Sequence, residues 1–286
     1  VSNNIVALYH SINIKTVFVS SKFLGQLDVL DKNNASVVSL RNSGILIESS
    51  DDDDNLLDKV IKSLISLPSS VSVMYLLLTD ACNLACDYCF IENQIPKDKN
   101  RIFMSVELVK KSVDFFTKAI RRHQKNFENK KTIIFYGGEP LMNKNVFMEA
   151  VRYIVDLKRE GVLPKLLSIN LVSNGLFFTP ELADFVYEHS VNVSISLDGD
   201  EVANNLHRRD FNGEPVFDCV MEKIKLLKSK GISVGISCTI NEETIKKQNE
   251  IIEFLIDRVG VKSLGFNILA RGHSIKLKDI CFTLTN

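Results

Sequence analysis

The sequence predicts an α/β protein whose main body is a partial (β/α)6 TIM-like barrel, preceded by a small N-terminal α+β appendage. Strand-like and helix-like segments alternate from residue 71 onward, and repeated βα units build a parallel sheet with right-handed crossovers. There are six such strand-like runs, too few for a complete eight-stranded barrel. The pattern before residue 70 differs, which predicts a separate first segment.

Residues 1–70 are expected to form a small N-terminal cap or recognition segment. Short β-type runs such as Thr16–Ser20 precede an acidic run, Asp51–Asp54, and a helix-like segment at Asn55–Leu67. Acidic residues at a helix N-terminus favour the helix dipole, so we interpret Asp51–Asp54 as a cap and solvated surface, with cation binding as the alternative. One face of the helix is apolar, with Leu56, Leu57, Val60, Ile61 and Leu64. Leu67–Ser70 is typical of a linker to residues 71–286.

The barrel elements follow from the periodicity of apolar residues. Strands are predicted at Val73–Leu78, Thr132–Tyr136, Leu167–Val172, Val191–Leu197, Ser233–Ile240 and Ser263–Leu269. Helices are predicted near residues 104–122, 143–160, 180–189, 215–230 and 242–257. Ser105 is a suitable N-cap for the first of them, whose apolar residues share one stripe.

Composition narrows the class of protein. Hydrophobic residues at 45% and charged residues at 24% are ordinary for a soluble globular chain of 286 residues. Thirty-five basic residues balance thirty-five acidic ones, which argues against nucleic acid or a membrane as partner. No apolar run approaches the roughly 20 residues that cross a bilayer, and no secretory signal begins the chain. Since six cysteines in a chain of this length do not make a disulfide scaffold, we expect a protein of the reducing cytoplasm.

Three of the six cysteines lie within eight positions, and this crowding indicates metal binding in a reducing compartment. Cys82, Cys86 and Cys89 directly follow the first barrel strand, where parallel α/β folds place active-site loops. Three thiolates can hold three irons of a [4Fe-4S] cubane and leave the fourth iron open to an external ligand. Zinc is the alternative, but a structural zinc site normally needs four protein ligands, and no nearby residue is an obvious fourth.

The remaining cysteines are interpreted without a metal. Cys219 begins a predicted helix and Cys238 lies in an apolar strand, so both are expected to pack in the core as small hydrophobic residues. Cys281 lies in a polar terminal segment, and its role stays open. His207 and the other histidines are not spaced as metal ligands.

The cysteine loop, with Tyr88 before the last cysteine, resembles the CxxxCxYC signature of the radical S-adenosylmethionine (SAM) superfamily. The resemblance covers roughly residues 74–270 and includes three later strand ends, Tyr136–Pro140, Ser173–Gly175 and Ser196–Gly199. The first of these resembles the family's GGEP segment. The stretch from His207 to Asp218 resembles a pattern of the subgroup that modifies peptides and proteins, which includes sactipeptide-type ribosomal peptide maturases and anaerobic sulfatase-maturing enzymes.

The resemblance implies two cofactors, a [4Fe-4S] cluster and SAM, with the amino and carboxylate groups of SAM on the open iron. Gly137 and Gly138 would let the backbone approach the methionine moiety where a Cβ would clash. Glu139 would direct negative charge towards the ammonium group. Arg208 would pair with the SAM carboxylate in a bidentate arrangement.

The other implied SAM contacts are polar or aromatic side chains at strand ends and in the cysteine loop. Ser173, Asn174 and Ser196 suit contacts with the ribose and the carboxylate. Tyr88 would lie against the adenine or pack the cysteine loop. The sequence identifies no general base.

The implied activity is reductive cleavage of SAM to methionine and a 5′-deoxyadenosyl radical, which abstracts hydrogen from a peptide or protein in ribosomal peptide maturation. A reductant such as flavodoxin or ferredoxin would be a partner. A radical SAM enzyme acting on a nucleotide or small metabolite would share the same motifs and stays open as an alternative. An alternative of another class is a non-enzymatic metal-binding module.

The C-terminal segment departs from the subgroup. Peptide-modifying members usually add a cysteine-rich domain with auxiliary clusters, whereas only Cys281 follows the sixth predicted strand here. A truncated sequence, a disordered tail and an enzyme without auxiliary clusters all stay open. Each of them puts thioether formation through an auxiliary cluster in doubt.

Overall fold

The computed structural model describes residues 4–10, 12, 15–29, 31–47, 49–66, 71–91, 100–122 and 127–269. The chain divides into two compact units, Val1–Ser69 and Ser70–Asn286. The predicted linker, Leu67–Ser70, lies entirely outside the described residues, and so does Cys281.

The first unit contains an antiparallel strand pair and two longer helices. Its elements are β1 (Ile5–His10), β2 (Lys15–Ser20), α1 (Ser21–Leu24), the 3-10 turn η1 (Leu27–Val29), α2 (Ala35–Asn42) and α3 (Ser50–Ser66). Helix α3 begins at Ser50, so the acidic run lies inside its first turns and not before the helix as expected. Asp53 of that run lies 3.0 Å from His10 Nε2, and this contact joins α3 to the end of β1.

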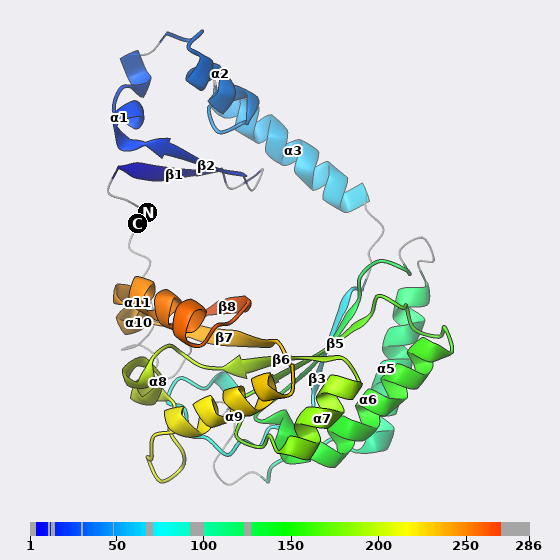
Figure 1. The fold of residues 1–286 in the computed structure, drawn as a ribbon. Helices are drawn as coiled ribbons and strands as arrows, with labels where there is room; N and C mark the ends of the chain where they lie inside the picture. The colour runs from blue at the N-terminus through cyan, green and yellow to red at the C-terminus, as the bar shows by residue number, and fades with distance from the viewer. Residues whose placement is uncertain are drawn as a thin grey trace. The chain divides into compact units, whose positions relative to one another are not determined.

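The second unit contains six parallel strands in sequential order, and this confirms the predicted partial barrel. Figure 1 shows the sheet curving without closing. The strands are β3 (Val73–Leu77), β4 (Thr132–Tyr136), β5 (Ser168–Ser173), β6 (Val191–Ser196), β7 (Val234–Ile240) and β8 (Ser263–Ile268). Since all six run in one direction, their carboxyl ends lie along one edge, where the connecting loops gather.

Helices connect successive strands, and α5, α6, α7 and α9 lie along the outer side of the sheet (Figure 1). Their bounds are α5 (Val106–Arg121), η3 (Pro140–Asn143), α6 (Lys144–Arg159), α7 (Pro180–Glu188), α8 (Glu201–His207) and α9 (Phe217–Ser229). As predicted, the Ser105 side chain caps α5. Helix α8 was not predicted, because seven residues are too few to show a helical period. Its N-cap is Asp200, which accepts from Ala203 N at 2.9 Å.

The helix predicted at 242–257 is divided into α10 (Glu242–Lys246), α11 (Gln248–Glu253) and a π-helical turn, η4 (Phe254–Arg258). Ile251 and Leu255 are buried on either side of the boundary between α11 and η4, so the apolar period continues there. Helix α10 has one apolar residue, the exposed Ile245, so too little apolar pattern precedes the first break to mark it. Periodicity alone therefore does not reveal the interruption.

The strands bury one face against the helices, and several of them carry polar residues on the other face. Ile133 and Phe135 of β4, like Leu171 of β5, are fully buried. On the opposite face, Thr132 Oγ1 lies 3.0 Å from Ser168 Oγ, and Asn192 Nδ2 donates to Asn170 Oδ1 at 3.0 Å. The inner face of β5 to β8 therefore carries several polar side chains, whereas β3 and β4 expose Tyr75, Leu77 and Tyr136 on that face.

Cys238 is buried in β7 as expected, but Cys219 is exposed on α9, and the prediction that it packs in the core is wrong. Helix α9 buries Val220, Ile224 and Leu227. Cys219 precedes Val220 by one residue, which places it about 100° away around the helix. Among the described helices, none has the length and apolar character needed to cross a membrane.

Candidate functional site

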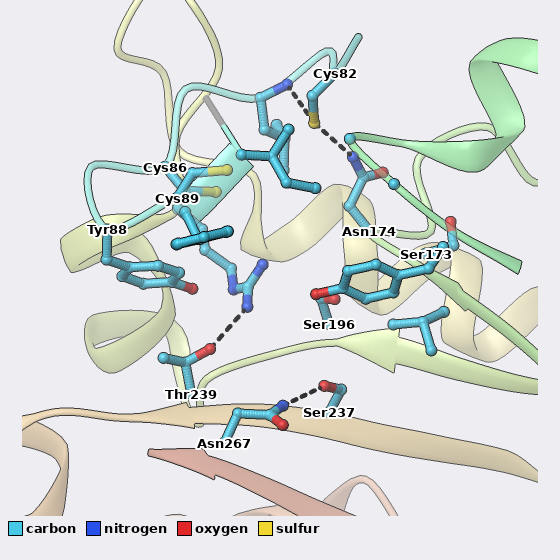
Figure 2. A pocket seen from close by; sticks show the side chains of 18 of the residues that line it. Cys82, Cys86, Tyr88, Cys89, Ser173, Asn174, Ser196, Ser237, Thr239 and Asn267 are labelled. Carbon is cyan, nitrogen blue, oxygen red and sulfur yellow. Dashed lines mark hydrogen bonds between the residues drawn. The ribbon is translucent and has the colours of Figure 1, made fainter. Parts of the chain in front are cut away.

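A cavity of about 400 Å³ lies at the carboxyl ends of the barrel strands. Its wall combines the loop after β3 with the ends of β4 to β8. Figure 2 shows labelled side chains from the loop after β3 and from the ends of β5 to β8 directed into it. The volume falls within the range of small-molecule sites, about 300–1,000 Å³. The cavity is therefore the candidate active site.

Nearly all side chains that the sequence singled out lie on this one wall. They are Cys82, Cys86, Tyr88, Cys89, Gly137, Gly138, Ser173, Asn174, Ser196 and Arg208. Glu139 is the exception, because it does not line the cavity. Residues up to 126 positions apart in the sequence thus meet at one place, although their individual contacts with a cofactor stay predictions.

The cysteine loop is held against the segment that follows α8. Ala85 N donates to the Arg209 carbonyl oxygen at 2.8 Å, and Leu84 forms an antiparallel bridge with Asp210. His207 Nδ1 lies 2.9 Å from Asp87 Oδ2. The loop therefore has a defined shape that presents its three sulfurs to the cavity.

The donor set fits a multi-iron cluster better than a single ion. Within the described ranges, no three His, Cys, Asp or Glu side chains stand close enough together to hold one metal ion. Thiolates on a cubane bind separate irons and stand farther apart than the ligands of one zinc. Burial raises the pKa of Cys82 to about 12 and that of Cys86 to about 11. A metal that binds these sulfurs must therefore displace their protons.

Gly137 and Gly138 are needed for a reason that differs from the one we expected. A Cβ on Gly137 would lie 2.3 Å from the Thr79 carbonyl oxygen, and one on Gly138 would lie 2.2 Å from that of Ala81. Gly138 N donates to Thr79 O at 2.8 Å, and Glu139 N donates to Ala81 O at 2.7 Å. The glycines thus admit the start of the cysteine loop; close approach to SAM stays a prediction.

Glu139 is buried with its carboxylate directed towards the end of β5. The carboxylate accepts from Leu141 N at 3.0 Å, from Ser173 Oγ at 2.8 Å and from Asn174 N at 2.7 Å. Burial raises the pKa of Glu139 to about 7, although the three hydrogen bonds lower it. This carboxylate joins β4 to β5, and its expected contact with an ammonium group stays a prediction.

Arg208 is already paired inside the protein. Its Nε donates to Asp198 Oδ2 at 2.8 Å and its Nη2 donates to Asp198 Oδ1 at 3.0 Å. Nη2 also donates to Thr239 Oγ1 at 3.4 Å. A guanidinium has five N–H donors, so two at Nη1 are left over from these contacts among the described residues. The bidentate partner is therefore Asp198, and an added carboxylate has only Nη1 to bind.

Asp198 is a buried residue at the centre of the site that sequence reasoning missed. Besides Arg208, it accepts from the Tyr88 hydroxyl and from Thr239 N, the latter at 2.8 Å. The Arg208 guanidinium lies 5.4 Å from the centre of the Tyr88 ring. Asp198 thus connects the cysteine loop, the end of β6 and β7. The sequence held a signal for it, because Asp198 lies at a strand end, within the segment Ser196–Gly199 that resembles the family.

Three further polar residues on the last two strands, Ser237, Thr239 and Asn267, line the cavity and were not predicted. Asn267 Nδ2 donates to Ser237 Oγ at 2.7 Å (Figure 2). Polar residues at alternate positions of an otherwise apolar strand indicate an inward face, and this pattern in β7 could have revealed Ser237 and Thr239.

A family model described as the radical SAM superfamily matches residues 76–255, more than half of the chain. Among curated proteins, a serine-type anaerobic sulfatase-maturating enzyme of Bacteroides thetaiotaomicron is 28% identical over 56% of this chain and 37% of its own length.

Among solved structures, native anSMEcpe with bound AdoMet and a peptide has a TM-score of 0.59 at 21% identity, covering 71% of this chain and 52% of that one. Streptococcus suis SuiB bound to precursor peptide SuiA has a TM-score of 0.52 at 13% identity, covering 94% and 63%. These two similarities show the fold alone. The chain spans less than two thirds of each of these three proteins.

Proposed function

Because the chain belongs to the radical SAM superfamily, we propose that it is an enzyme that cleaves SAM reductively at a [4Fe-4S] cluster and abstracts hydrogen from a peptide or protein. The observation that carries the proposal is the cavity of about 400 Å³, which brings the three cysteines together with most positions expected to contact SAM. A metal-binding module without activity would not need a cavity of this size beside its metal.

The chain's own residues would bind and orient the two cofactors. Cys82, Cys86 and Cys89 would hold three irons, and the two Nη1 donors of Arg208 suit a carboxylate beside them. When bound, the cluster and SAM supply the one-electron chemistry that starts hydrogen abstraction. Apolar side chains on the cavity wall, such as Leu84 and Val172, would exclude water from the reacting groups.

A peptide or protein substrate is favoured by the relatives. The Bacteroides relative is named as a sulfatase-maturating enzyme, and both solved structures contain a peptide. Polar side chains on the inner face that line the cavity, such as Ser237 and Asn267, are also suited to hydrogen bonds with a peptide backbone. A nucleotide or small metabolite would need the same cofactor residues, so only product analysis separates the two substrate classes.

The first unit, Val1–Ser69, is proposed to be a cap or a recognition segment for that substrate. It is compact by itself, and its strand pair exposes Ile5, Tyr9 and Phe18. Exposed aromatic and aliphatic residues on a short sheet are typical of a surface that binds a partner. Removal of this unit should raise the KM for a peptide substrate more than it changes the cleavage of SAM alone.

The test of the proposed function is anaerobic reconstitution of the full chain with iron and sulfide, followed by dithionite and SAM. We expect a [4Fe-4S] signal and release of 5′-deoxyadenosine, both lost in Cys82→Ala. Cys219→Ala is the matched control, because Cys219 is exposed on α9 and outside the cavity. Zinc in place of iron, or iron content equal in both variants without 5′-deoxyadenosine, would contradict the proposal.

A further inference from the structure

We propose that Asn174 sets the reduction potential of the cluster by donating a hydrogen bond to the sulfur of Cys82. Asn174 follows β5 and Cys82 belongs to the cysteine loop, and both line the cavity. Asn174 Nδ2 lies 3.8 Å from Cys82 Sγ (Figure 2). The inference rests on the proposed function, since it presumes that Cys82 holds an iron. It gives Asn174 a role that differs from the SAM contact expected from the sequence.

The orientation of the Asn174 amide is fixed by its neighbours. Its Oδ1 accepts from Leu176 N at 3.1 Å, and a backbone N–H can only donate. The other end of the amide must therefore be Nδ2. Nδ2 donates to Asn83 Oδ1 at 2.8 Å, and it has a second hydrogen for the Cys82 sulfur. A flipped amide would lose the contacts with both Leu176 and Asn83.

The backbone of Asn174 is also held in place. Asn174 N donates to the buried Glu139 carboxylate at 2.7 Å. Ser173 Oγ donates to the same carboxylate and accepts from Gly175 N at 2.9 Å. Only 6% of Asn174 is exposed, so water cannot easily replace its side chain beside the sulfur. Asn174 is therefore a rigid donor and not a mobile surface amide.

The physical effect follows from the charge that reduction adds. An electron makes the cluster and its sulfurs more negative, and a hydrogen-bond donor stabilises the reduced form more than the oxidised form. Cys82 Sγ already accepts from Leu84 N at 3.4 Å, a donor of the cysteine loop itself. Asn174 adds a donor from the position directly after β5, so a substitution there changes the potential without altering the sequence of the cysteine loop.

The experiment is a reduction titration of the reconstituted full chain without SAM, followed by electron paramagnetic resonance. Omitting SAM removes any effect of a SAM contact at Asn174. We expect Asn174→Ala to shift the midpoint to a more negative potential. Asn174→Asp, which keeps the size of the side chain but adds negative charge near the sulfur, should shift it further. Asn192→Ala is the control, because Asn192 hydrogen bonds to Asn170 and lies outside the cavity wall.

An Asn174→Ala midpoint equal to that of the wild type, with equal iron content, would overturn the inference. Loss of iron from both Asn174 variants would also overturn it, because the residue would then serve assembly and not the potential. If the wild type itself shows no [4Fe-4S] signal, the failure belongs to the proposed function. A wild type with a normal cluster and an unmoved Asn174→Ala midpoint instead refutes this inference alone.

Discussion

Asp198→Asn removes the negative charge on which the centre of the candidate site depends. The carboxylate accepts from Arg208 Nε and Nη2, from the Tyr88 hydroxyl and from Thr239 N. Only 2% of the Asp198 side chain and 10% of the Arg208 side chain are exposed. The substitution keeps the shape of the side chain but places an amide N–H opposite groups that also donate. It also leaves the buried Arg208 guanidinium without its counter-charge.

The expected cost is that of breaking a buried ion pair from one side, about 3–5 kcal/mol. A domain gains about 5–15 kcal/mol from folding, so the loss is a large fraction of its stability. For a unit of this size, each kcal/mol lowers Tm by about 2–4 °C, which predicts a decrease of about 6–20 °C. Replacing Arg208 as well should recover part of the lost stability, because the second change removes the unpaired charge. The coupling energy between the two substitutions should be about 0.5–3 kcal/mol.

The assay is urea and thermal unfolding of the metal-free full chain, followed by far-ultraviolet circular dichroism because the chain has no Trp. Asp200→Asn is the matched control. Asp200 lies two residues away and caps α8, and Asn is as good an N-cap as Asp, so this variant should unfold like the wild type. A loss of less than about 1 kcal/mol in Asp198→Asn would refute the reasoning, because a surface pair contributes that little.

Three further substitutions test the same site. Since burial raises the pKa of Glu139 to about 7, the folded chain retains a proton that the unfolded chain has lost. From about pH 5 to about pH 8 the free energy of unfolding of the wild type should therefore fall by about 3 kcal/mol relative to that of Glu139→Gln. A difference between the two that stays constant with pH in urea unfolding would contradict this. Gly138→Ala would place a Cβ against the Ala81 carbonyl oxygen, so it should lower the free energy of unfolding by about 1–3 kcal/mol and lower iron incorporation. Gly265→Ala is its control, because the added Cβ meets nothing closer than 3.8 Å, and it should change neither the stability nor the iron content. Tyr88→Phe removes one buried hydroxyl donor and should cost about 1.5–3 kcal/mol in urea unfolding without loss of iron; an iron-free variant would show that the hydroxyl is needed for assembly.

The sequence predicted the barrel and its order of elements because both depend on local patterns. Strand β4 was predicted with the bounds that the structure gives it, and the other barrel strands differ by a residue or two. The short helix α8 and the break before α11 escaped prediction, since α8 is too short to show a helical period and α10 has only one apolar residue, Ile245.

By itself, the sequence determined the fold class, the family and the residues that meet at the strand ends, because motif spacing and strand order fix which loops share one edge. Only the tertiary structure decided what those residues do to one another. Glu139 faces β5, Arg208 is paired with Asp198, and the two glycines make room for the cysteine loop. Each of these contacts joins residues that are distant in sequence. Their partners depend on side-chain direction and burial, which the order of amino acids does not display before the chain folds.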